Sequence, residues 1–89
     1  MKVTNDRIEP GEITKWLDKL EPMLENVEVI NQNGESFLQN AKAYVSDSRH
    51  FLEQGNLVKS FEAMIWAWSI FELCQELEIF MFSELKSEK

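Results

Sequence analysis

Residues 51–57 read Phe-Leu-Glu-Gln-Gly-Asn-Leu and predict a tight connection between two helices. Gly55 suits the left-handed backbone conformation that ends many helices, because glycine has no Cβ to clash there. Asn56 follows at once, and its side chain is a preferred cap for the first turn of a helix. Since the link is this short, we expect the two helices to run antiparallel.

In the segment before this turn, the residues expected to face the core recur every three or four positions, which predicts a helix over residues 35–54. Polar residues fill the positions between them, so the other side of this helix is expected to face water. The inward positions are Phe37, Leu38, Ala41, Tyr44, Val45, Ser48, Phe51 and Leu52.

The segment after the turn predicts a helix over residues 57–85, which is the most apolar part of the chain. At about 100° per residue, its apolar side chains cover roughly 240° of the helix circumference. A surface helix needs an apolar arc of only about 100°. We therefore expect this helix to be covered from more than one side. Its polar remainder is a narrow strip of Glu62, Ser69, Glu72 and Glu76.

A first helix is predicted over residues 10–27. Pro10 suits the opening position of a helix, and Pro22 predicts a kink because it removes one backbone hydrogen bond. Residues 1–8 are expected to be flexible, and residues 1–89 to form a single helical domain. The predicted fold is all-α, a three-helix up-and-down bundle with a kinked first helix and a tightly linked antiparallel pair.

Charge and composition exclude several classes of protein. Sixteen Asp and Glu against nine Lys and Arg give a formal charge of −7, whereas nucleic-acid binding needs clustered cations. The single cysteine, Cys74, cannot form an internal disulfide, which favours a reducing, cytoplasmic environment. No secretory signal is evident, and the longest charge-free run of the apolar segment, residues 63–71, is too short for a membrane span. We expect neither a membrane nor a nucleic acid as partner.

Few side chains in the sequence could carry chemistry. His50 follows Arg49 on the predicted water-facing side of its helix, and we interpret it as a surface residue. Cys74 has acidic neighbours that disfavour the reactive thiolate, and we interpret it as a small buried hydrophobe. Phosphate-binding loops and the common zinc motifs are absent. We expect no catalytic residue, no metal and no cofactor, and a protein that is not an enzyme.

A stripe of apolar residues on the third helix is the candidate interface. Its spacing of four, three, four, three is typical of two helices packed at a shallow angle. A small chain cannot hide all of so apolar a helix, so we expect a second copy or another protein's helix to cover the stripe. The predicted function is therefore an interaction or scaffolding module that self-associates through Trp66, Ile70, Leu73, Leu77 and Phe80.

Two other functions remain open at this point. The first is binding of a small ligand or a divalent cation, either at the acidic strip of Glu62, Glu72 and Glu76 or at the Trp-lined end of the bundle. The second is a degenerate nucleic-acid-associated helical domain, which the negative charge disfavours.

The chain also resembles a known family between Ala41 and Leu73. Tyr44, Asp47, residues 51–57 and the pair Ala67-Trp68 are together similar to the archaeal domain-of-unknown-function family 357. Members of that family are small helical proteins without an established activity. The resemblance therefore implies a helical fold and an archaeal origin, and it implies no chemistry.

Overall fold

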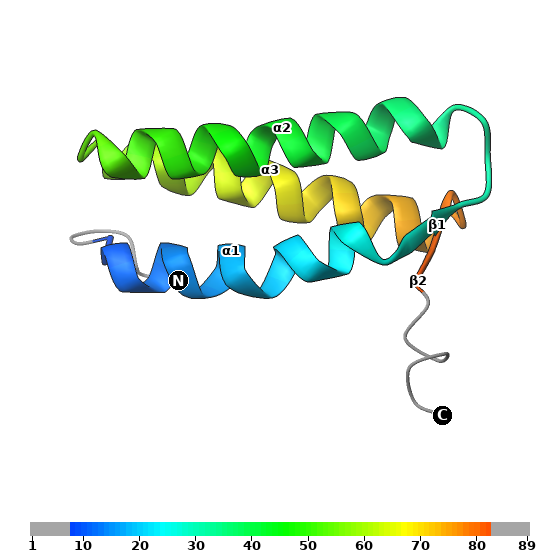
Figure 1. Ribbon diagram of the computed structural model, residues 1–89, viewed down its shortest axis with the longest axis horizontal. Helices are drawn as coiled ribbons and strands as arrows, with labels where there is room; N and C mark the ends of the chain where they lie inside the picture. The colour runs from blue at the N-terminus through cyan, green and yellow to red at the C-terminus, as the bar shows by residue number, and fades with distance from the viewer. Residues whose placement is uncertain (1–7, 83–89) are drawn as a thin grey trace.

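The computed structural model describes residues 8–82 as three helices and one small sheet (Figure 1). The elements are α1 (Pro10–Glu25), β1 (Val27–Val29), α2 (Gly34–Glu53), α3 (Leu57–Glu76) and β2 (Phe80–Phe82). The three helices lie side by side, and consecutive helices run in opposite directions (Figure 1). The predicted three-helix bundle is confirmed. The flexibility expected for residues 1–8 falls almost wholly outside the described residues.

The core lies where α1 packs on the α2/α3 pair. Four residues of α1 recur at spacings of three and four, and all of them are buried: Ile13, Leu17, Leu20 and Leu24. They meet the inward residues of the other two helices, among them Val45, Ala67 and Phe71. The helix stays continuous through Pro22, and the kink expected there stays a prediction. No helix within residues 8–82 has both the length and the apolarity to cross a membrane.

The turn between α2 and α3 has the geometry that its sequence predicts. Gly55 has a φ of 77°, and its N–H donates to the Leu52 carbonyl at 3.0 Å. The Asn56 N–H donates to the Phe51 carbonyl at 2.9 Å, which completes a Schellman motif. The Asn56 side chain also accepts a hydrogen bond from the Lys59 N–H at 3.3 Å and so caps α3.

Two buried serines hold α2 and α3 close together beyond this turn. The Ser48 hydroxyl donates to the Ser60 carbonyl at 2.7 Å, and the Ser60 hydroxyl donates to the Ser48 carbonyl at 2.8 Å. Both side chains are fully buried, and each satisfies its polar atoms on the other helix. Because serine is small, the two helix backbones approach closely at this level.

The structure corrects the predicted end of the third helix. The helix ends at Glu76 rather than at residue 85, because Glu78 takes the left-handed conformation with a φ of 60°. The same Schellman motif forms here: the Glu78 N–H donates to the Gln75 carbonyl at 3.1 Å, and the Ile79 N–H to the Cys74 carbonyl at 2.8 Å. The last predicted helical residues, 83–85, lie outside the described residues.

A two-stranded antiparallel sheet replaces the predicted helix ends. β1 pairs with β2 so that Val27 faces Phe82 and Val29 faces Phe80. The first helix therefore ends at Glu25, two residues earlier than predicted, because Val27 begins β1. The sheet lies at the end of the bundle opposite the Gly55 turn (Figure 1).

Candidate interaction surface

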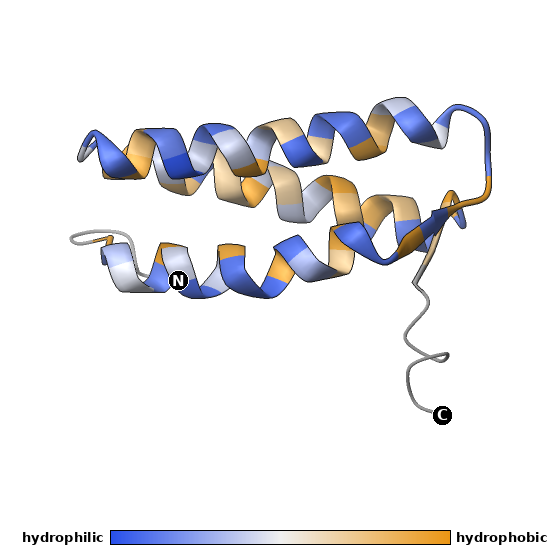
Figure 2. Ribbon diagram, in the orientation of Figure 1, coloured by the Kyte–Doolittle hydropathy of each residue, from blue (hydrophilic) through white to orange (hydrophobic). Residues whose placement is uncertain are grey.

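The α3 helix carries hydrophobic residues along its whole length, whereas α1 and α2 are more hydrophilic (Figure 2). Three of the predicted interface residues are exposed: Trp66 at 56%, Leu73 at 58% and Leu77 at 60%. Leu73 and Leu77 follow Trp66 by seven and eleven residues, close to two and three full turns. These three side chains therefore form one line along α3.

The other two predicted interface residues have different positions. Ile70 is half-buried and packs against the core. Phe80 is 3% exposed and packs against Phe71, with ring centroids 6.5 Å apart. Including Phe80 in a helical stripe is wrong, because α3 ends before it and β2 turns its side chain into the core.

Two aromatic residues of α2 lie beside this line, an exposed Phe37 and a half-buried Tyr44 that also packs against the core. Tyr44 stacks on Trp66 with ring centroids 6.3 Å apart and an interplanar angle of 23°. Phe37 precedes Tyr44 by seven residues on the same side of α2, and it is exposed. The sequence interpretation placed both residues among the inward positions of α2. We call this surface the α2/α3 apolar face, and it consists of Phe37, Tyr44, Trp66, Leu73 and Leu77.

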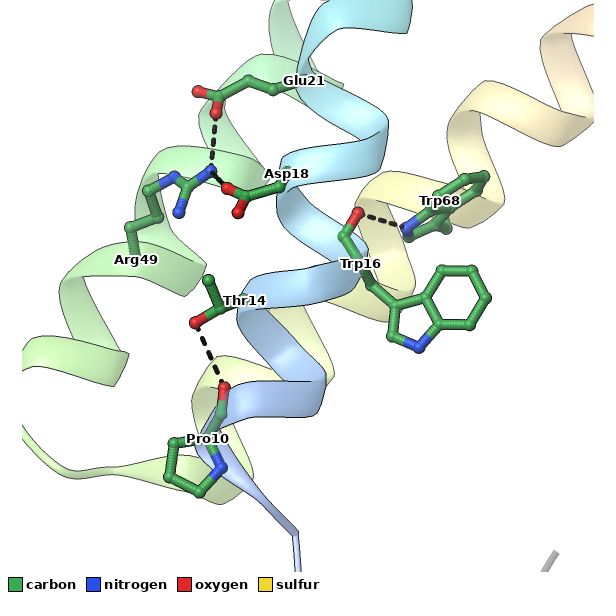
Figure 3. A network of polar contacts seen from close by, with 7 residues as sticks. All are labelled: Pro10, Thr14, Trp16, Asp18, Glu21, Arg49 and Trp68. Carbon is green, nitrogen blue, oxygen red and sulfur yellow. Dashed lines mark hydrogen bonds and ion pairs between the residues drawn. The ribbon is translucent and has the colours of Figure 1, made fainter.

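The α2/α3 apolar face lies on the side of the helix pair away from α1. Arg49 of α2 reaches α1, where it pairs with Asp18 at 3.1 Å and Glu21 at 2.6 Å (Figure 3). At about 100° per residue, Tyr44 points roughly 140° away from Arg49. On α3, Trp66 points roughly 160° away from Trp68, whose side chain faces α1. No element within residues 8–82 covers this face.

The exposed apolar surface continues at the end of the bundle that carries the sheet. Ile30 and Met81 are both 54% exposed. A hollow of about 380 Å³ separates them, and it is lined by Ile30, Gln75, Glu78, Phe80 and Met81. Sequence reasoning missed this part, because it placed Met81 on a helix.

The acidic strip does not form a cluster. Glu62 and Glu72 are ten residues apart on α3, which separates them by about 15 Å along the helix. Glu72 and Glu76 are one turn apart beside a shallow depression that Ser69, Leu73 and Gln75 complete. Within residues 8–82, no three His, Cys, Asp or Glu side chains lie close enough to hold a metal ion.

A separate groove lies between α1 and α3. The Trp68 Nε1–H donates to the Trp16 carbonyl oxygen at 3.2 Å (Figure 3). The two indole rings also meet edge to face, with centroids 5.6 Å apart and an interplanar angle of 86°. The groove encloses about 330 Å³ and is lined by Trp16, Phe61, Met64, Ile65, Trp68 and Glu72.

His50 and Cys74, the two residues considered for catalysis, have environments that do not favour it. His50 is exposed, and its ring lies beside the Phe51 ring with centroids 6.0 Å apart. Cys74 is buried, and this burial raises the pKa of its thiol, which disfavours the nucleophilic thiolate.

The comparisons with known proteins identify the family. A family model described as "Protein of unknown function (DUF357)" matches residues 13–80. The chain belongs to the DUF357 family. A crystal structure from that family, of protein AF1782 from Archaeoglobus fulgidus, superposes with a TM-score of 0.74 at 38% identity. The similarity covers 82% of this chain and 91% of the Archaeoglobus chain.

These matches confirm the family resemblance found in the sequence. The match to the DUF357 model extends across all three helices and ends at Phe80, the first residue of β2. No protein of curated function matches the sequence. The DUF357 assignment therefore supplies the fold.

Proposed function

We propose that this DUF357 protein is a non-enzymatic interaction module that self-associates through the α2/α3 apolar face. The observation that carries the proposal is the exposure of three large residues in line on α3: Trp66, Leu73 and Leu77. Monomeric soluble proteins rarely leave a continuous apolar patch of this kind on their surface. A second copy of the chain would remove it from water.

The shape of the face suits a twofold arrangement. Two α3 helices can cross antiparallel about an axis between Ile70 and Leu73. Trp66 of one copy then lies opposite Leu77 of the second copy, so that a large side chain meets a smaller one. A twofold interface must be self-complementary in this way. With α2 included, four helices would surround one shared apolar layer.

An interface of ordinary size fits on a chain of this surface area. Stable interfaces bury roughly 800 Å² on each partner, a modest share of the 5946 Å² surface of this chain. Ile30 and Met81, which are both exposed, add apolar surface at the end of the bundle that carries the sheet. Tyr44 and Trp66 are residue types that often dominate the binding energy of interfaces.

The support for a non-enzymatic role does not come from the charge of the chain. The support comes from the α2/α3 apolar face, where Trp66, Leu73 and Leu77 offer packing surface. The cation-binding alternative has no convergent ligand set within residues 8–82 to support it. The ligand-binding alternative concerns the groove between α1 and α3, where Trp16 and Trp68 meet.

Sedimentation of the protein over a range of concentrations tests the proposal. We expect the wild-type chain to form a dimer at high micromolar concentration. Leu73→Glu should weaken the dimer by at least about tenfold without loss of helix content, because Leu73 is exposed and its side chain contributes to the interface rather than to the fold. Leu73 is a better choice than Ile70, whose half-buried side chain also packs on the core.

Ile65→Glu is the matched control. Ile65 is also exposed on α3, but it lines the groove beside α1, and its side chain points about 80° away from that of Leu73. The same charge at Ile65 should leave the dimer intact. A wild-type protein that stays monomeric at high micromolar concentration, or a dimer that Leu73→Glu does not weaken, would show that the proposal is wrong.

A further inference from the structure

The groove between α1 and α3 is a second surface, distinct from the α2/α3 apolar face. Ile65 lines the groove, while the next residue, Trp66, belongs to the apolar face, and their side chains point about 100° apart. The two surfaces therefore lie on different sides of α3. An inference about the groove does not depend on self-association.

The walls of the groove are apolar and held in place. The Trp68 Nε1–H donates a hydrogen bond of 3.2 Å to the Trp16 carbonyl oxygen, and this bond fixes the orientation of the Trp68 ring against α1. Trp68 is also held from behind by an edge-to-face contact with Phe71, with ring centroids 6.0 Å apart. Trp16 remains 38% exposed and Ile65 44% exposed. Aromatic and aliphatic groups of a ligand could therefore bury surface against these walls without rearranging them.

Two lysine ammonium groups lie beside Trp16, the α1 residue that lines the groove, and we call this side of the groove the α1 rim. The Lys15 and Lys19 Nζ atoms lie 6.0 and 5.4 Å from the centroid of the Trp16 ring. Residues 8–82 form two ion pairs, and Arg49 makes both of them. Among these residues, no carboxylate oxygen therefore lies within 4.0 Å of the Nζ atom of either lysine. Among residues 8–82, therefore, these two cations have no ion-pair partner, in a chain whose formal charge is −7.

The remaining charge at the groove determines which ligand fits. Glu72 lines the α3 wall and is the one charged residue that residues 8–82 contribute to the lining. Indole faces attract cations, but the two ammonium groups already at Trp16 would repel a further one. An anionic group at the α1 rim would be attracted by the ammonium groups of Lys15 and Lys19. It would also lie across the groove from the Glu72 carboxylate.

We propose that the groove binds a small apolar anion, such as an aromatic or aliphatic carboxylate or sulfonate. The apolar body lies against Trp16, Trp68 and Ile65, and the acidic group lies beside Lys15 and Lys19. The apolar walls supply affinity, and the two lysines supply the preference for an anion over a neutral molecule of the same shape.

Two fluorescent probes that differ by one charged group test this assignment. The anion 8-anilinonaphthalene-1-sulfonate should bind at least about fivefold more tightly than the neutral N-phenyl-1-naphthylamine, which lacks the sulfonate. The double substitution Lys15→Gln/Lys19→Gln should remove that difference and leave the affinity for the neutral probe unchanged. High salt should narrow the difference in the wild-type protein, because exposed charges are screened.

Two further variants locate the binding site. Ile65→Glu should weaken both probes by at least about tenfold, since it places a carboxylate in the groove. Leu73→Glu, which tests self-association, should leave both affinities unchanged, so the two proposals can fail separately. Absence of binding to the wild-type protein, equal affinity for the two probes, or binding that survives Ile65→Glu would each overturn the assignment.

Discussion

Glu78 occupies at the end of α3 the position that Gly55 occupies at the end of α2. Both residues follow the helix in a Schellman motif, and both have a positive φ, 60° for Glu78 and 77° for Gly55. Glycine adopts this conformation freely, whereas a residue with a Cβ is strained by about 1 kcal/mol or more. The end of α3 therefore carries backbone strain that the end of α2 does not.

Replacing the strained residue should stabilise the protein. We expect Glu78→Gly to raise the free energy of unfolding by about 1 kcal/mol in urea denaturation, because glycine removes the clash at positive φ. Gly55→Val is the opposite change at the matching position and should lower the free energy of unfolding by about 1 to 2 kcal/mol. If Gly55→Val left the denaturation midpoint unchanged, the turn would not have the backbone conformation described.

Gly34→Ala should destabilise the protein although alanine favours helices. A Cβ at Gly34 would lie 2.7 Å from Val29 Cγ1 and 2.8 Å from Ile79 Cγ2, so α2 would have to move away from the sheet. We expect a loss of about 1 to 3 kcal/mol from this overpacking. Gly11→Ala provides the control, because a Cβ at Gly11 meets nothing within 4 Å. A Gly34→Ala variant as stable as the Gly11→Ala variant would contradict the close approach.

The buried pair of Ser48 and Ser60 should behave as one unit. We expect either serine-to-alanine change to cost about 1 to 2 kcal/mol, because it removes buried hydrogen bonds between α2 and α3. The double change should cost less than the sum of the two, since the hydroxyls contact each other at 3.2 Å. Chemical denaturation of the three variants measures this coupling. Strict additivity would indicate that the two hydroxyls act independently.

Burial of Cys74 should make stability depend on alkaline pH. Its folded-state pKa is raised by burial, so the thiol stays protonated in the folded chain after it begins to ionise in the unfolded chain. This contribution to stability is full below the unfolded pKa and is lost as pH rises beyond about 8.5. Cys74→Ala should flatten the decline in the urea midpoint at alkaline pH. An identical decline in both proteins would exclude Cys74 as a cause.

The α2/α3 hairpin could be predicted because its signals are local. Gly55 and Asn56 are adjacent, and each residue type has one strong reason to occupy that place in a turn. The buried line of α1 from Ile13 to Leu24 was equally readable, because its period is that of a helix. The exposed line of Trp66, Leu73 and Leu77 was predicted from the surplus of apolar residues on α3.

The features that were missed depend on contacts between distant segments. Glu78 gives no sign that a helix ends, since glycine is the usual residue at such a position. The strands β1 and β2 are three residues each, too short for their alternation to stand out against the helical pattern beside them. The contact between Trp16 and Trp68 could not be predicted from the sequence of either helix, because it depends on how α1 packs against α3.

The pairing of β1 with β2 constrains the order in which the chain can fold during synthesis. Phe80–Phe82 is the last described element to be synthesised, yet it pairs with the strand that directly follows α1. A nascent chain can form the α2/α3 hairpin early, because its contacts are local. Within the described residues, β1 lacks its strand partner and the core lacks Phe80 until β2 has been synthesised.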